Sequence, residues 1–153
     1  MKVFVAGGAG FIGNHLVRRL LSRPETHVRV YDNFSSGRIW HLQDCRSNAQ
    51  LEIVRGDVKD LPDLRRAMEG CDTVFHLASN PDIAKAMTQP DIDFWEGNYL
   101  TQNILEAMRQ LGVGRLLYAS GSGVYGDTGT KPVFEDYSPL LPISTYGASK
   151  LAG

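Results

Sequence analysis

The chain has 153 residues, 22% of them charged, and a formal net charge of −1 at pH 7. This length suits one domain that buries a substantial core. A net charge so close to zero argues against nucleic acid or an anionic membrane as the main partner, and no apolar run approaches the ~20 residues that cross a bilayer.

Short apolar runs, typical of buried strands, alternate with amphipathic segments, typical of helices, along the first half of the chain. Lys2–Ala6 predicts a buried strand, and the apolar residues of Phe11–Leu21 recur at helical spacing until Pro24. Further strands are predicted at residues 27–31, 51–54 and 73–77, and a helix at residues 61–68. Residues 35–50 predict either a loop or a short helix.

The second half of the chain continues this alternation. Residues 91–111 predict a long helix that ends at Gly112, followed by a strand at residues 115–119. The core-facing side of the helix is expected to comprise Leu100, Ile104, Leu105 and Met108. A loop rich in glycine and proline occupies residues 121–142, and Ser144 is a candidate N-cap for a last helix. Strands alternating with helices predict an α/β fold whose parallel sheet is covered on both faces.

The cysteines and the N-terminal segment indicate the cell compartment in which the protein is expected. Cys45 and Cys71 do not have the spacing of a metal-binding pair. The first strand is apolar like the core of a signal peptide, but glycines follow at once and no cleavage pattern is present. We therefore expect a cytoplasmic protein with two incidental thiols and no metal site.

Three glycines between the first strand and the first helix predict a phosphate-binding turn. Gly7, Gly10 and Gly13 are spaced three apart. In dinucleotide-binding folds the first such glycine permits a tight turn, the second lets the backbone approach a pyrophosphate, and the third lets the helix pack closely on the sheet. The helix N-terminus then offers free N–H groups to the phosphates.

Asp32 strengthens this interpretation, because it ends the second predicted strand 19 residues after Gly13. A carboxylate at that place can hold the hydroxyls of an adenosine ribose and repels a 2′-phosphate, which favours NAD over NADP. Arg38 is the only nearby residue that argues otherwise, and it can equally be a solvated loop charge.

Other polar residues follow the next two predicted strands. Asp57 and Val58 either lie against an adenine or form a simple turn, and the spacing alone does not decide. His76 ends the fourth predicted strand at the edge where ligands bind in such sheets, although a structural role is the commoner one for a histidine there.

Tyr146 and Lys150 predict a catalytic pair near the end of the chain. Residues four apart lie on one face of a helix, so a phenol and an ammonium are held side by side. A tyrosine hydroxyl titrates near pH ~10, and a neighbouring cation favours the phenolate. The pair makes chemical sense if a cofactor adds a second positive charge.

These motifs occur together in a recognisable order: Gly7–Gly13, Asp32–Gly37, Gly56–Val58, His76–Ala78, Asn98, Val124–Asp127 and Tyr146–Lys150. The whole chain resembles an extended short-chain dehydrogenase/reductase of the NAD-dependent epimerase/dehydratase family, closest to nucleotide-sugar 4-epimerases. The resemblance implies a Rossmann fold, a doubly wound parallel sheet, with tightly held NAD and a nucleotide-sugar substrate, most simply a UDP-sugar.

The resemblance also implies roles for particular residues. Tyr146 would be the catalytic base, and Lys150 would bind the nicotinamide ribose and tune Tyr146. The cofactor would be lined by Gly7, Gly10, Phe11, Ile12, Gly13, Asp32, Asn33, Phe34, Ser35, Ser36, Gly37, Asp57, Val58, Leu77, Ala78, Ser79, Asn98, Tyr146 and Lys150.

The family also requires a hydroxyl after the fifth strand, and here the chain departs from the usual pattern. Gly121 interrupts the hydroxyl residues, so Ser122 is the predicted catalytic hydroxyl and Ser120 the alternative. Dehydratases and decarboxylases of the family usually carry acidic residues just before the Val-Tyr-Gly element, where this chain has Ser122 and Gly123. This favours epimerisation, or simple oxidation and reduction.

Members of the family are roughly twice as long as this chain. We therefore expect an amino-terminal part, incomplete at its carboxyl end, with the region that grips the substrate beyond Gly153. The alternatives to an epimerase are an NAD-binding fragment without catalysis and a nucleotide-sugar reductase or dehydratase. Relatives often dimerise through the helices predicted at residues 91–111 and after Ser144, so a homodimer of the whole protein is a further expectation.

Overall fold

The computed structural model describes all residues 1–153 and divides them into two compact units. The first, which we call the sheet unit, consists of Met1–Ala78 and Gln102–Ala119. The second, the helix unit, consists of Ser79–Thr101 and Ser120–Gly153. The single NAD-binding domain expected over residues 1–153 stays a prediction.

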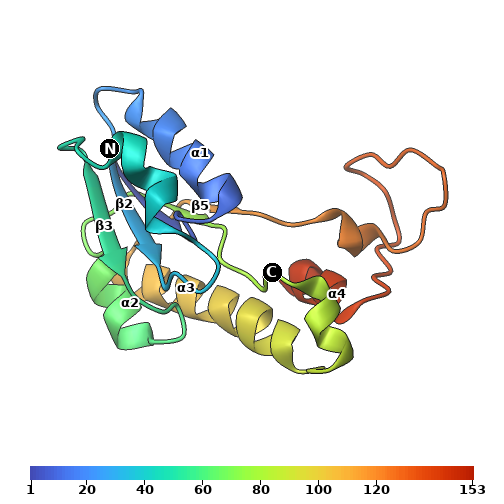
Figure 1. The fold of residues 1–153 in the computed structure, drawn as a ribbon. Coiled ribbons are helices and arrows are strands. Elements are labelled where there is room, and N and C mark those ends of the chain that lie inside the picture. The colour runs from blue at the N-terminus through green and yellow to red at the C-terminus, as the bar shows by residue number, and fades with distance from the viewer. The chain divides into compact units, whose positions relative to one another are not determined.

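The sheet unit contains a five-stranded parallel sheet in the order β3-β2-β1-β4-β5 (Figure 1). Its strands are β1 (Lys2–Ala6), β2 (His27–Asp32), β3 (Leu51–Arg55), β4 (Thr73–His76) and β5 (Leu116–Tyr118). Val5 of the central strand β1 pairs with Val30 on one side and Phe75 on the other. The chain order reverses at β1, and ligands bind at the carboxyl ends of strands beside such a point. The predicted α/β, Rossmann-like fold is confirmed.

Helices cover both faces of this sheet (Figure 1). They are α1 (Phe11–Leu21), the 3₁₀-helix η1 (Ile39–Cys45), α2 (Leu61–Met68) and the part of α3 (Tyr99–Leu111) from residue 102 onward. Val17 and Leu20 of α1 pack against Val3, Val5 and Val30, all five of which are buried. Burial of each such side chain stabilises the fold by ~1.5–3 kcal/mol relative to exposure.

The opposite face of the sheet carries aromatic side chains. Phe4 and Tyr31 are fully buried, with ring centroids 5.5 Å apart. The adjoining helix α2 is capped by Asp60, whose carboxylate accepts a hydrogen bond from Asp63 N at 3.0 Å. This cap satisfies one of the free N–H groups at the helix start and fixes the chain after β3.

The helix unit contains four short helical elements. They are the 3₁₀-helix η2 (Ile83–Met87), the π-helix η3 (Phe94–Asn98), the 3₁₀-helix η4 (Ser122–Tyr125) and α4 (Thr145–Ala152). Ser144 caps α4 as predicted, because its Oγ accepts a hydrogen bond from Gly147 N at 3.0 Å. Within this unit α4 packs against both η3 and η4.

The segment at residues 91–111 differs from the uniform helix expected there. Its residues 94–98 form a π-helix before the regular α3 begins at Tyr99. The prediction that Leu105 faces the core is wrong, since its side chain is 44% exposed. Leu100, Ile104 and Met108 recur every four residues and are buried, whereas Leu105 lies about 100° further around the helix. Strand ends elsewhere differ from the predictions by a residue or two.

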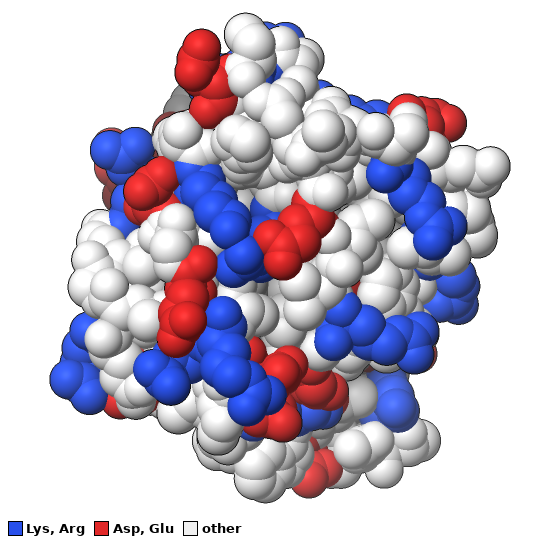
Figure 2. Space-filling model, turned by 90° about the vertical axis from the view of Figure 1, so that its left-hand side faces the viewer, with Lys and Arg blue, Asp and Glu red and all other residues white.

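The surface mixes charges of both signs. Figure 2 shows Lys and Arg side chains interspersed with Asp and Glu over the face that it presents. Several are paired, including Arg29 with Glu52 at 2.6 Å and Arg66 with Asp63 at 2.9 Å. No helix has the length and apolar composition needed to cross a membrane. No group of three or more His, Cys, Asp or Glu side chains is placed to hold a metal ion, and both cysteines are free thiols.

Candidate cofactor site and catalytic helix

The glycine turn joins β1 to α1 at the carboxyl edge of the sheet. Gly7 has a φ of +80°, and a Cβ atom built there would lie 2.7 Å from Ala78 N. Its N–H donates to Tyr31 O at 2.9 Å, and its carbonyl accepts from Gly10 N at 3.2 Å. A Cβ at Gly13 would collide with the carbonyl oxygen of Gly7. Only glycine fits at both places, which is the steric requirement that the sequence pattern predicted.

The N-terminus of α1 can receive an anion. Its N-cap is Gly10, which has no side chain to accept from the first N–H groups. Phe11 and Ile12 are 78% and 65% exposed, so the first turn opens to solvent. Asn14 turns its side-chain amide back onto the carbonyl oxygens of Gly10 and Phe11, at 2.8 and 2.6 Å. The backbone N–H groups and the positive end of the helix dipole therefore suit a pyrophosphate.

Asp32 is buried at the end of β2, with 8% of its surface exposed. Its Oδ2 accepts from Ala9 N at 2.9 Å, and its Oδ1 accepts from Phe34 N at 2.8 Å. A carboxylate has about four acceptor positions, so two remain for ribose hydroxyls. Arg38 donates to the carbonyl oxygens of Gly37 and Ser35 at 2.9 and 3.4 Å, which occupies its guanidinium within its own loop.

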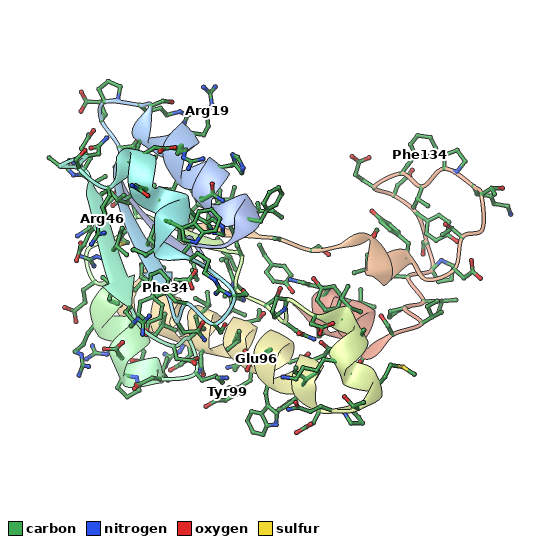
Figure 3. All side chains as sticks on the ribbon, viewed as in Figure 1. Arg19, Phe34, Arg46, Glu96, Tyr99 and Phe134 are labelled. Carbon is green, nitrogen blue, oxygen red and sulfur yellow. The ribbon has the colours of Figure 1, made fainter.

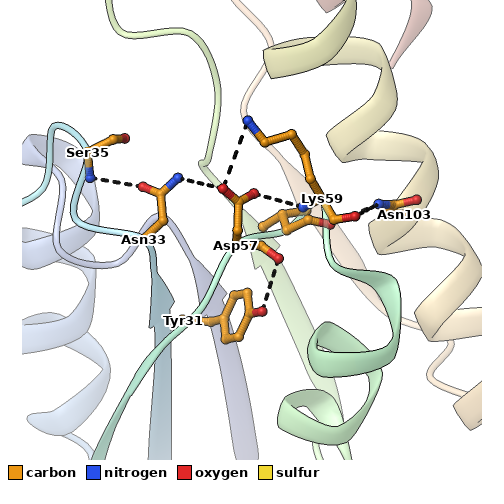
Figure 4. A network of polar contacts seen from close by, with 7 residues as sticks. Tyr31, Asn33, Ser35, Asp57, Lys59 and Asn103 are labelled. Carbon is orange, nitrogen blue, oxygen red and sulfur yellow. Dashed lines mark hydrogen bonds and ion pairs between the residues drawn. The ribbon is translucent and has the colours of Figure 1, made fainter.

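A polar network connects the loops after β2 and β3 (Figure 4). Asn33 Oδ1 accepts from Ser35 N at 2.9 Å, and Asn33 Nδ2 donates to Asp57 Oδ2 at 3.2 Å. Asp57 Oδ1 accepts from Lys59 N at 2.9 Å. The Tyr31 hydroxyl lies below, 3.1 Å from the Asp57 carbonyl oxygen. The network therefore gives Asn33, Ser35 and Asp57 fixed positions, as a site for adenosine requires.

The Asp63 carboxylate and the Arg66 guanidinium hold Tyr31 in its place below this network. The Tyr31 hydroxyl also donates to Asp63 Oδ2 at 2.8 Å. Burial, together with the Asp63 carboxylate, raises the pKa of Tyr31 well above its usual value, so Tyr31 stays a donor. Hydrogen bonds from Arg66 and Tyr31 lower the pKa of Asp63, which stays an acceptor.

Two residues that hold the predicted cofactor loops were missed in the sequence. Asn103 of α3 donates to the carbonyl oxygens of Val58 and Lys59 at 2.9 and 3.2 Å (Figure 4). The His41 ring bonds through Nδ1 to the carbonyl oxygen of Ala9 at 2.6 Å, which ties η1 to the glycine turn. A signal existed for Asn103, since it interrupts the buried side of an amphipathic helix, but His41 lies in a segment without periodicity.

The other predicted residues of this edge are divided between the units. Leu77 and Ala78 follow β4 in the sheet unit, and Leu77 N donates to Ala6 O at 2.9 Å. Ser79 and Asn98 belong to the helix unit. His76 is 1% exposed, and its ring stacks at 5.4 Å from that of Tyr118. This packing agrees with a structural role for His76, which stays a prediction.

An open cavity of about 560 Å³ lies beside β3 in the sheet unit. It is lined by Phe34, Ile39, Arg46, Leu51, Ile53 and Arg55. Figure 3 labels Phe34 and Arg46 among them. The Arg55 guanidinium stands 5.1 Å from the centre of the Phe34 ring. Phe34 is the only one of these residues that was predicted to touch the cofactor, so the cavity borders the predicted adenosine end and does not contain the glycine turn.

In the helix unit, α4 places Tyr146 and Lys150 on one face, as predicted. Lys150 Nζ lies 5.6 Å from the centre of the Tyr146 ring. Lys150 is buried, with 5% of its surface exposed, and this burial lowers the pKa of its ammonium group. Tyr146 is half-buried.

The loop with the candidate hydroxyls packs on α4 through its glycines. A Cβ at Gly121 would lie 3.9 Å from Tyr146 Cε1, and a Cβ at Gly123 would lie 3.3 Å from Gly147 Cα. Ser120 and Ser122 are exposed. The structure brings both serines to the segment that borders α4, and the choice between them stays a prediction.

Comparison with known proteins gives a consistent result. The sequence model of the NAD dependent epimerase/dehydratase family matches residues 3–153. A UDP-glucose 4-epimerase from Corynebacterium glutamicum is 32% identical over 153 residues, which cover 99% of this chain and 44% of that protein.

Two solved structures extend the comparison. A UDP-glucose 4-epimerase from Thermus thermophilus in complex with NAD is 34% identical, with a TM-score of 0.87, and the match covers 99% of this chain and 48% of that one. A dTDP-glucose 4,6-dehydratase from Streptomyces venezuelae with NAD bound is 33% identical, with a TM-score of 0.92 and coverage of 99% and 49%. The chain thus spans about half the length of the proteins it matches.

Proposed function

Because the chain belongs to the NAD-dependent epimerase/dehydratase family, we propose that it is the NAD-binding part of a nucleotide-sugar 4-epimerase, similar to UDP-glucose 4-epimerases. The substrate would be a UDP-sugar, oxidised transiently at C4 and reduced again from the other face. The observation that carries the proposal is the Tyr146–Lys150 pair on one face of α4, in a chain that also has the glycine turn and Asp32.

The residues of the sheet unit fit NAD. The turn at Gly7 and Gly13 leaves no space for side chains, and α1 offers its N–H groups to the pyrophosphate. The remaining acceptor positions of Asp32 would hold the adenosine ribose. Asp57 and Val58, fixed by the network of Figure 4, would lie along the adenine. Bound NAD supplies a hydride acceptor and donor.

The residues of the helix unit would handle the proton. Tyr146 would take the proton of the sugar hydroxyl and return it after the sugar has turned over. Lys150 would hold the nicotinamide ribose and place a positive charge beside the Tyr146 ring. Ser122, or alternatively Ser120, would hydrogen bond the reacting hydroxyl and orient it toward Tyr146.

The proposal favours epimerisation over dehydration, although both activities occur among the relatives. Dehydration needs an extra acid and base, and Ser122 and Gly123 provide no carboxylate just before Val124. An NAD-binding fragment without catalysis is the second candidate, because the matched proteins are about twice as long. A homodimer through α3 and α4 of the whole protein stays a prediction.

Replacement of Tyr146 by phenylalanine tests the proposal. In the protein that contains this chain, Tyr146→Phe should abolish interconversion of UDP-sugars, because the ring stays and only the proton carrier is lost. Calorimetry should show unchanged NAD affinity. Retained epimerisation would contradict the role of Tyr146. NAD binding without turnover of any UDP-sugar by the unchanged protein would favour the second candidate.

A further inference from the structure

A buried carboxylate in the helix unit holds the start of the catalytic helix. Asp93 is 1% exposed. Its Oδ1 accepts a hydrogen bond from Asn80 Nδ2 at 2.8 Å, and its Oδ2 accepts one from Thr145 Oγ1 at 2.6 Å. Thr145 is the first residue of α4 and directly precedes Tyr146. The two ends of the second bond are 52 residues apart in the chain.

The neighbours of Asp93 are themselves fixed. Asn80 is 3% exposed, its N–H donates to Glu96 O at 3.0 Å, and its Oδ1 accepts from Asp82 N at 2.9 Å. A buried carboxylate is costly unless it is hydrogen bonded, so this arrangement resists any movement that would leave Asp93 unpartnered. Thr145 is therefore held to the segment around residue 93, and not only to its own loop.

A second contact holds α4 to the same segment. Gly97 lies in the π-helix η3, and a Cβ built there would be 2.8 Å from Ser149 Oγ. Ser149 in turn donates from Oγ to the carbonyl oxygen of Tyr146 at 2.8 Å. Asp93 and Gly97 thus contact α4 at its start and near its middle, at residues on either side of Tyr146.

The cap at Ser144 cannot replace these contacts. It satisfies the N–H of Gly147 and so helps the helix to form, but it joins α4 only to the residue next to it. A helix of eight residues is too short to be stable alone in water and takes its position from what it packs against. The distant bond from Thr145 to Asp93 supplies that position.

We propose that Asp93 is a positioning residue, which acts through Thr145 to set where α4 holds the Tyr146 hydroxyl. The expected effect on turnover rests on the proposed function. Misplacement of a reacting group by about 1 Å can cost a factor of ~100 in rate, so loss of the bond should lower kcat far more than it changes KM.

Thr145 allows a mild test that does not empty the buried site. In the protein that contains this chain, Thr145→Val removes the donor with little change in volume and should lower kcat for UDP-sugar epimerisation at least tenfold, with KM within about threefold. Thr145→Ser keeps the hydroxyl and should retain at least half of the wild-type kcat. Adding Asp93→Ala to Thr145→Val should cost less than the product of the two single effects, because both remove one interaction.

Asp82→Ala is the matched control. Asp82 caps η2 in the same unit by accepting from Ala84 N at 3.1 Å, and it does not bond to Thr145. Its replacement should leave kcat within twofold. A normal kcat in Thr145→Val, a Thr145→Ser variant as impaired as Thr145→Val, or fully multiplicative effects in the double variant would each overturn the proposal.

Hydrogen exchange separates this proposal from the proposed function. The amides of Gly147 and Ala148 bond back to Ser144 at the start of α4. They should exchange at least fivefold faster in Thr145→Val and at the wild-type rate in Asp82→Ala. If the unchanged protein turns over no UDP-sugar while these amides respond, the proposed function fails and the positioning role of Asp93 stands. If turnover is normal and the amides do not respond, the positioning role fails.

Discussion

Lys150 Nζ lies 5.6 Å from the centre of the Tyr146 ring, on the buried side of a helix of eight residues. The ring face is the negative side of the aromatic quadrupole and attracts the ammonium. Burial acts against the ammonium, because it disfavours the charged form and lowers the pKa of Lys150. The pair is therefore held at a cost in stability that depends on pH.

The first prediction concerns this pH dependence. Because the pKa of Lys150 is lower in the folded state, the unfolded chain binds more protons between that lowered pKa and the ordinary value of ~10.4. The contribution of Lys150 to folding stability should therefore rise with pH across this window. The free energy of unfolding of Lys150→Met minus that of the wild type should fall as pH increases from ~8 to ~10, measured by urea unfolding. A difference that is constant or increases with pH would contradict the lowered pKa.

The second prediction concerns the glycine turn. Gly7→Ala combines a left-handed backbone conformation with a Cβ only 2.7 Å from Ala78 N, so it should lower the free energy of unfolding by at least ~1–2 kcal/mol and abolish NAD binding. Gly114→Ala is the matched control, since a Cβ there meets nothing within 4 Å and φ is not positive. It should be neutral or stabilise by up to ~1 kcal/mol. Urea unfolding and calorimetry with NAD measure both effects, and similar losses in the two variants would refute the steric argument.

A structural feature can be predicted from the sequence when the residues that cause it lie close together in the chain. The strands, the helices α1 and α2, the glycine turn and the Ser144 cap follow from spacing within a few residues, and they were predicted. The exposure of Leu105 could not be read from an apolar residue at a helical position, because it depends on which neighbouring turn faces the sheet. The close approach of Gly97, in the π-helix, to Ser149 could not be read either, because the two residues are more than 50 positions apart in the chain.

The same distinction applies to the site. Asp32 could be singled out because its spacing from the glycines is characteristic, and it lies at the end of β2 as expected. Asn103 and Asp93 bond to partners that are as far as 45 and 52 residues away in the chain. Asn103 leaves a local signal, because it interrupts the buried side of an amphipathic helix. Nothing in the local sequence around Asp93 distinguishes Asp93 from a solvated polar side chain.

The third prediction concerns the choice of cofactor. Asp32→Asn keeps one acceptor oxygen but loses the charge, and hydrogen bonds to a neutral group are about half as strong as those to a charged one. NAD affinity should fall about tenfold, which corresponds to ~1.4 kcal/mol. Arg38→Ala is the control, because Arg38 is occupied by the carbonyl oxygens of Gly37 and Ser35, and it should leave NAD affinity within twofold. Tighter binding of NADP than of NAD by the unchanged chain would contradict the assignment of Asp32.

The fourth prediction separates Ser122 from Ser120. Both side chains are exposed, and the structure gives neither hydroxyl a hydrogen-bond partner within the chain, so Ser→Ala at either place should change the free energy of unfolding by less than ~0.5 kcal/mol. Any effect of these substitutions on turnover then reports on the chemical step and not on folding.

In the protein that contains this chain, Ser122→Ala should lower kcat at least a hundredfold with NAD affinity unchanged, since the reacting hydroxyl loses the group that orients it. Ser120→Ala should stay within threefold of the wild type. The reverse pattern would transfer the role to Ser120. Equal, small effects of both would mean that neither serine orients the reacting hydroxyl of the sugar.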